Sequence, residues 1–240
     1  KAKRMTTNYK FRFEHFYKKN INGNQFDMLT KYLPKINIDE FYPGKGKDSF
    51  VMLNKDSHYN YYSIYKKDTE EPFAAKFFVE LNNDNNINKI KKEIIIESKF
   101  NHPAILRNIG FSETNLVNPK ENSKELTIFT KLIPRNLEDI ISKNPEQLTD
   151  TNKLKIIIGI ASGILEMYNK NIVNRGLTTQ NILLNENFEP VIHDFFYSSH
   201  AGDDLQISTE APQLDAPLDT SLYTVPELYI NYLNIYNSYK

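Results

Sequence analysis

The order in which strand and helix patterns alternate is the feature of this sequence that most restricts its fold. β-prone runs come first, one helical pattern interrupts them, and a long helical pattern with short hairpins ends the ordered part. This order predicts an α+β protein in which a five-stranded antiparallel lobe with one helix precedes a mainly helical lobe. The predicted strands are 50–53, 61–65, 73–79, 105–111, 126–132, 182–184 and 190–193, and the predicted helices are 25–32, 87–100, 137–142 and 152–171.

The composition supports a folded chain and excludes several kinds of site. The chain has 240 residues, 40% of them apolar, which is enough for one large domain or one domain with two lobes. The absence of cysteine excludes a disulfide scaffold, a thiolate zinc site and a cysteine nucleophile. No apolar run approaches the roughly 20 residues that span a bilayer. We therefore expect a soluble, cytoplasmic protein without a membrane span.

Positive charge is concentrated near the N-terminus, where residues 1–40 contain more Lys and Arg than Asp and Glu. A basic flank can contact nucleic acid or anionic lipid, but a solvated flank is the simpler interpretation. A nucleic-acid partner is therefore not expected.

The clearest helical period lies in residues 152–171, which Thr149 or Asp150 can cap. Its apolar residues recur on one face of the predicted helix. This apolar stripe consists of Leu154, Ile157, Ile158, Ala161, Leu165 and Tyr168.

Several short motifs follow one another in a fixed order along these elements. A predicted strand contains Ala74-Ala75-Lys76, the next helix carries Glu93, and a His-Pro-Ala-Ile-Leu turn begins at His102. They are followed by Asn174-Arg175-Gly176-Leu177-Thr178 with Asn181, by Asp194-Phe195-Phe196, and by Val225-Pro226-Glu227. From about Phe41 to Glu227, this series resembles the eukaryotic protein kinase domain, in its Ser/Thr or tyrosine-kinase-like groups.

The resemblance implies a site for ATP and Mg²⁺ between the two lobes. Lys76 would hold the phosphates, and Glu93 would orient Lys76 through an ion pair. Thr130 would be the gatekeeper residue beside the adenine, whose edge would bond to the backbone from Lys131 to Ile133. The adenine would be enclosed by Ile64, Ala74 and Leu183, and the metal ligands would be Asn181 and Asp194.

Two departures from the family affect phosphoryl transfer directly. Gly176 occupies the place of the catalytic Asp, which accepts or orients the proton of the substrate hydroxyl in the family. Thr178 replaces the catalytic-loop Lys, so a cation for the transferring phosphoryl group is also missing. Together these changes predict the loss of several orders of magnitude in rate.

The phosphate-covering loop is also abnormal, and two registers compete for it. Residues 44–51 nearly match its glycine pattern but lie far before Lys76, whereas residues 57–64 have the usual spacing and contain no glycine. We prefer the second register. In it, Tyr59 and Tyr62 would keep the backbone away from the phosphates.

Three more departures concern the assembly of the active conformation. Phe196 replaces the glycine that follows Asp194-Phe195. Asn174 and Glu97 fall where the family has an apolar stack between the lobes, and polar groups there cost desolvation unless they are bonded. We therefore expect a poorly assembled active conformation.

Arg175 matches a family residue that binds a phosphate in the segment before Glu227. One hypothesis is that Asp219 or a phosphorylated Thr220 docks on Arg175. The alternative is a mobile acidic loop, which the run of acids without Lys or Arg favours.

These observations predict a pseudokinase that signals by binding protein partners and that binds ATP weakly. An active Ser/Thr kinase with a non-standard catalytic loop and a ligand-free scaffold domain are the alternatives. The expected boundaries are a basic flank at 1–40, an N-lobe at 41–133 and a partial C-lobe at 134–240. The later helices of the family do not appear in this sequence, so we expect either a trimmed sequence or a truncated C-lobe. In the second case helix 152–171 would have an uncovered face that a partner chain can cover.

Overall fold

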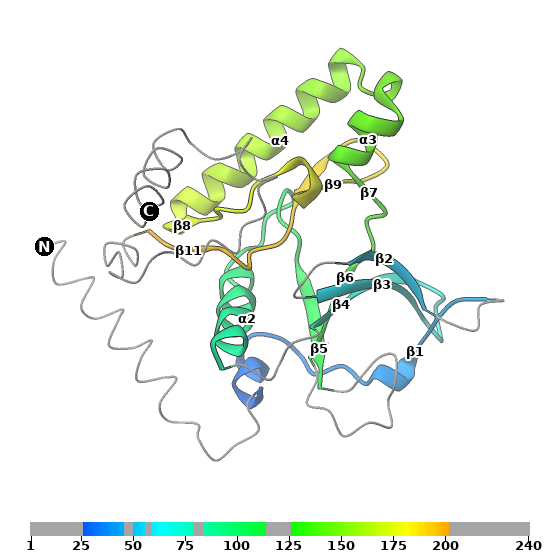
Figure 1. Ribbon diagram of the computed structural model, residues 1–240, viewed down its shortest axis with the longest axis vertical. Helices are drawn as coiled ribbons and strands as arrows, with labels where there is room; N and C mark the ends of the chain where they lie inside the picture. The colour runs from blue at the N-terminus through cyan, green and yellow to red at the C-terminus, as the bar shows by residue number, and fades with distance from the viewer. Residues whose placement is uncertain (1–25, 46–49, 56–58, 79–83, 114–125, 202–240) are drawn as a thin grey trace, which may run out of the picture.

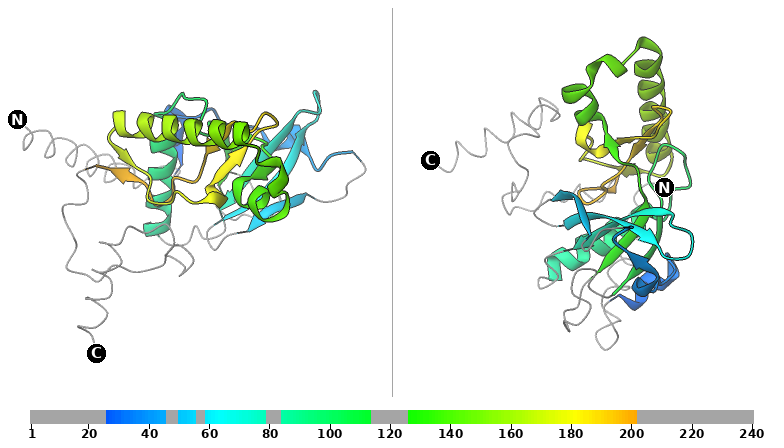
Figure 2. Two further views of the ribbon diagram at one scale, coloured as in Figure 1. Left: turned by 90° about the horizontal axis from the view of Figure 1, so that it is seen from above. Right: turned by 90° about the vertical axis from the view of Figure 1, so that its right-hand side faces the viewer.

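The computed structural model describes residues 26–45, 50–55, 59–78, 84–113 and 126–201. Within them, a curved sheet with helix α2 forms one lobe, and helices α3 and α4 with two small sheets form the other (Figures 1 and 2). The predicted α+β fold with two lobes is therefore confirmed. No helix in the described part of the chain is long and apolar enough to cross a membrane.

The N-lobe sheet is antiparallel throughout, with strand order β1-β3-β4-β6-β5 and with β2 paired to β3. Five of its strands overlap the predicted ones, and the two-residue β1 was not predicted. The bounds are β1 Phe41–Tyr42, β2 Val51–Lys55, β3 Tyr59–Lys66, β4 Pro72–Phe78, β5 Asn108–Ser112 and β6 Thr127–Lys131.

Helix α2 (Asp84–Glu97) packs its isoleucines, among them Ile90 and Ile94, against a cluster that includes Phe78 and Phe111 from the sheet. Leu29 from the 3-10 turn η1 (Asp27–Lys31) joins the same cluster, in the region of the predicted helix 25–32. The opposite face of the sheet is covered by a second cluster around Phe41 and Phe129, which we call the outer cluster. Apolar side chains therefore cover both faces of the sheet.

The C-lobe begins with β7 (Arg135–Asn136) and α3 (Leu137–Lys143), after which the turn η3 (Pro145–Gln147) leads into α4 (Asp150–Asn169). Thr149 caps α4, since its hydroxyl accepts a hydrogen bond from the Asn152 backbone at 3.2 Å. The remaining elements are β8 Ile172–Val173, η4 Thr179–Asn181, β9 Ile182–Leu184, β10 Pro190–Ile192 and β11 Ser199–His200.

Helix α4 packs through a narrow face and not through its apolar stripe. Ile156, Gly163 and Met167 are buried, and a Cβ on Gly163 would lie only 2.8 Å from Ile192 of β10. Because Gly163 has no side chain, α4 can lie closer to β10 than a larger residue at this position would allow. All six residues of the predicted stripe are exposed, with Ile157 at 63% and Tyr168 at 76%.

The contrast between neighbouring isoleucines on α4 predicts different costs of truncation. Ile156 is 4% exposed and packs with Leu137, Ile140 and Leu184, so Ile156→Ala should lower the free energy of unfolding by about 2–4 kcal/mol. Ile157 has no such packing, and Ile157→Ala should change it by less than about 0.5 kcal/mol. Urea denaturation of both variants checks the orientation of α4, and equal losses would contradict it.

Candidate functional site

An ion pair buried between strand β4 and helix α2 forms the centre of the candidate site. Lys76 Nζ lies 2.5 Å from Glu93 Oε1, and the two side chains are only 6% and 1% exposed. Burial opposes the charge on Lys76, but the carboxylates of Glu93 and Asp194 outweigh it and hold the pKa of Lys76 above its ordinary value. The structure thus brings together the two residues that the sequence predicted as a pair.

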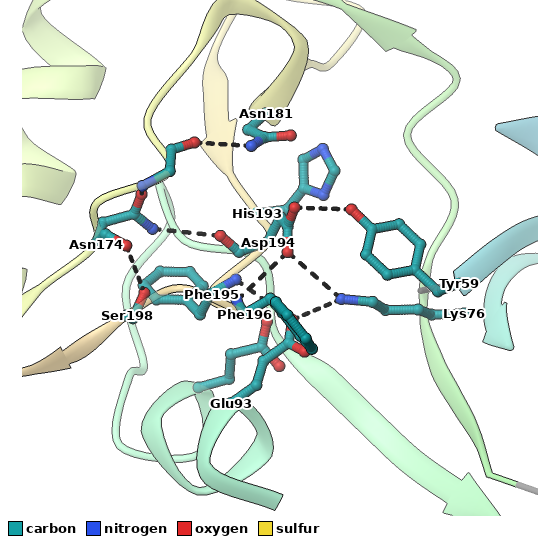
Figure 3. Close-up of polar contacts among 12 residues, drawn as sticks. Tyr59, Lys76, Glu93, Asn174, Asn181, His193, Asp194, Phe195, Phe196 and Ser198 are labelled. Atoms are coloured by element: carbon teal, nitrogen blue, oxygen red, sulfur yellow. Dashed lines mark hydrogen bonds and ion pairs between the residues drawn. The ribbon is translucent and has the colours of Figure 1, made fainter. Parts of the chain in front are cut away.

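Asp194 reaches this pair from the C-lobe (Figure 3). Its Oδ1 lies 3.6 Å from Lys76 Nζ, and the backbone N–H of Phe195 donates to Glu93 at 3.3 Å. Asp194 has φ of +65°, a left-handed conformation that costs a non-glycine residue energy unless the surroundings hold it. Burial opposes ionisation of Asp194, but Lys76 outweighs this effect and lowers its pKa.

Tyr59 makes a contact that the sequence alone does not predict. Its hydroxyl donates to Asp194 Oδ2 at 2.7 Å, and Lys76 Nζ lies 4.0 Å from the centre of its ring (Figure 3). The sequence had grouped Tyr59 with Tyr62 as bulky residues over the phosphates. Because side chains alternate along a strand, the two point to opposite faces of β3, and Tyr62 packs into the outer cluster with Phe41. The alternation of side chains along a strand is the sequence signal that could have placed Tyr59 and Tyr62 on different faces.

The loop before η4 is held by polar contacts around Gly176. Its N–H donates to Asn174 Oδ1 at 2.9 Å, and its carbonyl accepts from Asn181 Nδ2 at 2.7 Å. The three atoms nearest to a Cβ built at Gly176 belong to Asn174, Tyr197 and Asn181, at 3.7–3.9 Å, and none of these side chains is a carboxylate. The position therefore has room for a Cβ, and within the described residues its nearest side chains supply no acidic group.

The predicted adenine-side residues are only partly brought together. Thr130 pairs with Ala74 across β6 and β4, so both share the sheet face of Lys76. The Thr130 hydroxyl is buried and has no hydrogen-bond partner within the described residues. Leu183, between two buried neighbours in β9, is partly exposed.

Ile64 does not belong with Ala74, which corrects the prediction that both enclose the adenine. Ile64 lies opposite Phe73, whereas Ser63 lies opposite Ala74. Residues directly opposite one another share a face, and successive residues alternate between faces. Ile64 is therefore fully buried in the outer cluster. Of the other predicted residues, Lys131 at the end of β6 is exposed and Ile133 and Thr178 are partly exposed.

The expectation of a poorly assembled active conformation is wrong for the described residues. Asn174 donates to the Asp194 carbonyl at 3.4 Å, and its own carbonyl accepts from the Ser198 hydroxyl at 3.0 Å. Glu97 accepts from Asn108 Nδ2 at 2.5 Å. These bonds offset the desolvation of the polar groups. Phe195 is fully buried and packs beside Phe100 of the N-lobe.

Glu97 gives the site a predicted pH dependence. Burial and the neighbouring Glu93 raise the pKa of Glu97 from 4.5 to about 8, with Lys76 acting in the opposite direction and Asp194 adding a smaller rise. The unfolded chain loses this proton at lower pH than the folded chain. Stability should therefore fall as pH rises from 4.5 to about 8.

Glu97→Gln removes this titration and keeps an acceptor for Asn108. Because Glu97 is partly exposed, some of the effect is screened, and we expect a gain of about 1–2 kcal/mol in unfolding free energy at pH 7. At pH 4 the gain should vanish. Urea denaturation from pH 4 to 8 measures it, with the exposed Glu146→Gln as control. A pH-independent difference between wild type and Glu97→Gln would contradict the assignment.

Arg175 donates to the Ser199 hydroxyl at 2.6 Å. The hypothesis that Arg175 binds Asp219 or a phosphorylated Thr220 concerns two residues outside the described part of the chain, so it stays a prediction.

A lysine–glutamate pair beneath a curved sheet, an aspartate from the opposite lobe and an asparagine-containing loop define the class of kinase-like domains. Residues 59–238 match the protein kinase domain family, and the chain belongs to this family.

Curated relatives are themselves kinases. The chain is 27% identical over 133 residues to a probable serine/threonine-protein kinase of Arabidopsis thaliana, covering 54% of this chain and 31% of the relative. It is 25% identical over 212 residues to mitogen-activated protein kinase 13 of the same plant, covering 88% and 52%. It is 32% identical over 146 residues to a probable inactive serine/threonine-protein kinase of Dictyostelium discoideum, covering 59% and 11%. The chain thus spans about half the length, or less, of these relatives.

Proposed function

We propose that this kinase domain is a pseudokinase that acts in cytoplasmic signalling by binding protein partners. The carrying observation is Gly176, which leaves the catalytic loop without a carboxylate to accept the acceptor's proton. Thr178 also lacks the charge to stabilise a transferring phosphoryl group. The Dictyostelium relative carries the description of an inactive kinase.

The same proposal assigns weak nucleotide binding to the cleft between a lobe at 41–133 and a lobe at 134–240. Lys76 and Glu93 are its phosphate-side residues. The adenine-side residues are Ala74, Thr130, Lys131, Ile133 and Leu183. The unpartnered hydroxyl of Thr130 fits a polar ligand on that side.

Mg²⁺ fits this site poorly. Asn181 is positioned as a ligand, because its Nδ2 donates to the Gly176 carbonyl and leaves its oxygen available. At Asp194 the Tyr59 hydroxyl donates to one carboxylate oxygen and the Phe196 N–H to the other, at 3.4 Å, so a metal on Asp194 would compete with these two hydrogen bonds. In the described part of the chain, no three His, Cys, Asp or Glu residues form a metal cluster.

An active Ser/Thr kinase remains the second candidate because Lys76, Glu93 and Asp194 are assembled. Phosphoryl transfer from radiolabelled Mg·ATP to a generic protein acceptor separates the two functions. The proposal predicts equal incorporation with wild type and with the Lys76→Ala/Asp194→Ala double variant. Higher incorporation with wild type would replace the pseudokinase proposal with the active kinase.

A further inference from the structure

Two tyrosines on β3 lie on the same sheet face as Lys76. Tyr61 lies directly opposite Lys76 in the β3–β4 pair, and Tyr59 lies two residues away along the same strand. Both therefore share the sheet face of Lys76. If either residue were glycine, a ligand could approach the strand backbone on this face. The two aromatic side chains occupy that space instead.

Tyr59 connects the two lobes at the Lys76–Asp194 contact. Its side chain is 5% exposed, its hydroxyl bonds to Asp194 at 2.7 Å, and its ring lies beneath the Lys76 ammonium at 4.0 Å. The ring also packs edge-on against Phe78 and Tyr61. A ligand that approached both Lys76 and Asp194 from this side would have to displace the ring and break a charge-assisted hydrogen bond.

Tyr61 makes a second connection between the lobes beside the first. Its ring meets the ring of His193 edge-on, with centroids 5.9 Å apart. His193 is itself buried, with 7% of its surface exposed. The charge of Lys76 is already balanced by Glu93 and Asp194 at 2.5 and 3.6 Å. This end of the cleft therefore offers little to a polyanion.

A second group of residues differs in character. Ala74 is small and lies opposite Thr130 across β4 and β6, and Leu183 on β9 is partly exposed. Thr130 is 3% exposed, and its hydroxyl has no hydrogen-bond partner among the described residues. A buried hydroxyl without a partner favours a ligand with a hydrogen-bonding group. A neutral heteroaromatic ring supplies such a group without needing a cation.

We propose that Tyr59 and Tyr61 occupy the phosphate and metal end of the cleft, so that the site takes a phosphate-free nucleoside such as adenosine without a divalent metal. This inference rests on the proposed nucleotide binding and narrows it to one ligand class. Tyr59 and Tyr61 are specificity-determining residues in this account, because they disfavour the Mg²⁺-triphosphate part of ATP.

The test is calorimetric titration of the whole chain with adenosine and with Mg·ATP, each repeated with EDTA. Wild type should bind adenosine with the same affinity in the presence and absence of EDTA. Its affinity for Mg·ATP should be lower than its affinity for adenosine by a factor of about ten or more. In Tyr59→Ala/Tyr61→Ala, the ratio of Mg·ATP to adenosine affinity should rise about tenfold or more and become sensitive to EDTA.

Two further variants guard against a folding defect. Tyr59→Phe keeps the ring and removes only the hydroxyl, so it should shift the ratio in the same direction by a smaller factor. Tyr62→Phe changes the opposite face of β3 and should leave the ratio as in wild type.

The inference is overturned if wild type binds Mg·ATP more tightly than adenosine and loses it in EDTA, if neither Tyr59 variant shifts the ratio, or if wild type fails to bind adenosine. Failure of the pseudokinase proposal would appear separately, as phosphoryl transfer above the double-variant background. The two failures are therefore distinguishable.

Discussion

Lys76→Ala is expected to lower the free energy of unfolding by about 3–5 kcal/mol. The lysine is the counter-ion of Glu93, whose side chain is 1% exposed, and it also lies near the buried Asp194. Removing the ammonium leaves two carboxylates close together in a poorly hydrated site. Much of the cost is this unpaired charge and not the loss of an attractive contact. Urea denaturation at pH 7 measures it.

Lys66→Ala is the matched control for this variant. Lys66 pairs with Asp68 at 3.4 Å, but their side chains are 33% and 64% exposed. An ion pair at the surface contributes little, so the control should change stability by about 0.5 kcal/mol or less. A loss below about 1 kcal/mol for Lys76→Ala would show that the Lys76–Glu93 pair is not buried as described.

Phe195→Ala is expected to cost a similar 3–5 kcal/mol. The Phe195 ring is fully buried and joins residues of both lobes, with Ile96 and Phe100 on the N-lobe side and Met167 and Ile192 on the other. Its removal leaves a cavity between rigid elements that cannot readily collapse. Urea denaturation of the variant measures this cost.

Tyr168→Ala provides an aromatic truncation without a cavity, since Tyr168 on α4 is 76% exposed. It should change the unfolding free energy by about 0.5 kcal/mol or less. If Phe195→Ala were as mild as this control, the described packing between the lobes would be wrong.

Much of the N-lobe could be predicted from local patterns, but the orientation of β3 could not. The β-prone run around Tyr61 located the strand, and the spacing to Lys76 placed it near the cleft. A shift of one residue exchanges the two faces of a strand. Because the sequence does not fix which face is which, it predicts Ile64 on the adenine side. The structure instead buries Ile64 in the outer cluster and places Tyr61 on the sheet face of Lys76.

Helix α4 and Glu97 show two other limits of sequence reasoning. The helical period located α4, but the strongest apolar stripe is exposed and a face with Gly163 makes the contact. Period alone does not say which face a neighbour covers. The sequence predicts an unfavourable Glu97, because its partner Asn108 lies on a different element, β5, and no sequence pattern indicates the pair.

The order and spacing of the motifs are sufficient to place Lys76, Glu93 and Asp194 in one site, because each motif has a fixed position in the fold. It could not reveal the Tyr59–Asp194 hydrogen bond. That contact depends on which side chain of β3 reaches across the cleft, 135 residues away in sequence.

A single-turnover experiment tests the central claim most directly, namely that the lysine–glutamate pair is assembled in a domain that lacks the carboxylate for phosphoryl transfer. The chain in molar excess over radiolabelled Mg·ATP, with a generic protein acceptor, is followed until the label in the Lys76→Ala/Asp194→Ala background is constant. The account predicts that wild type follows this background throughout. Transfer by wild type above it would contradict the account, because another group would then have to take the acceptor's proton in place of a side chain at Gly176.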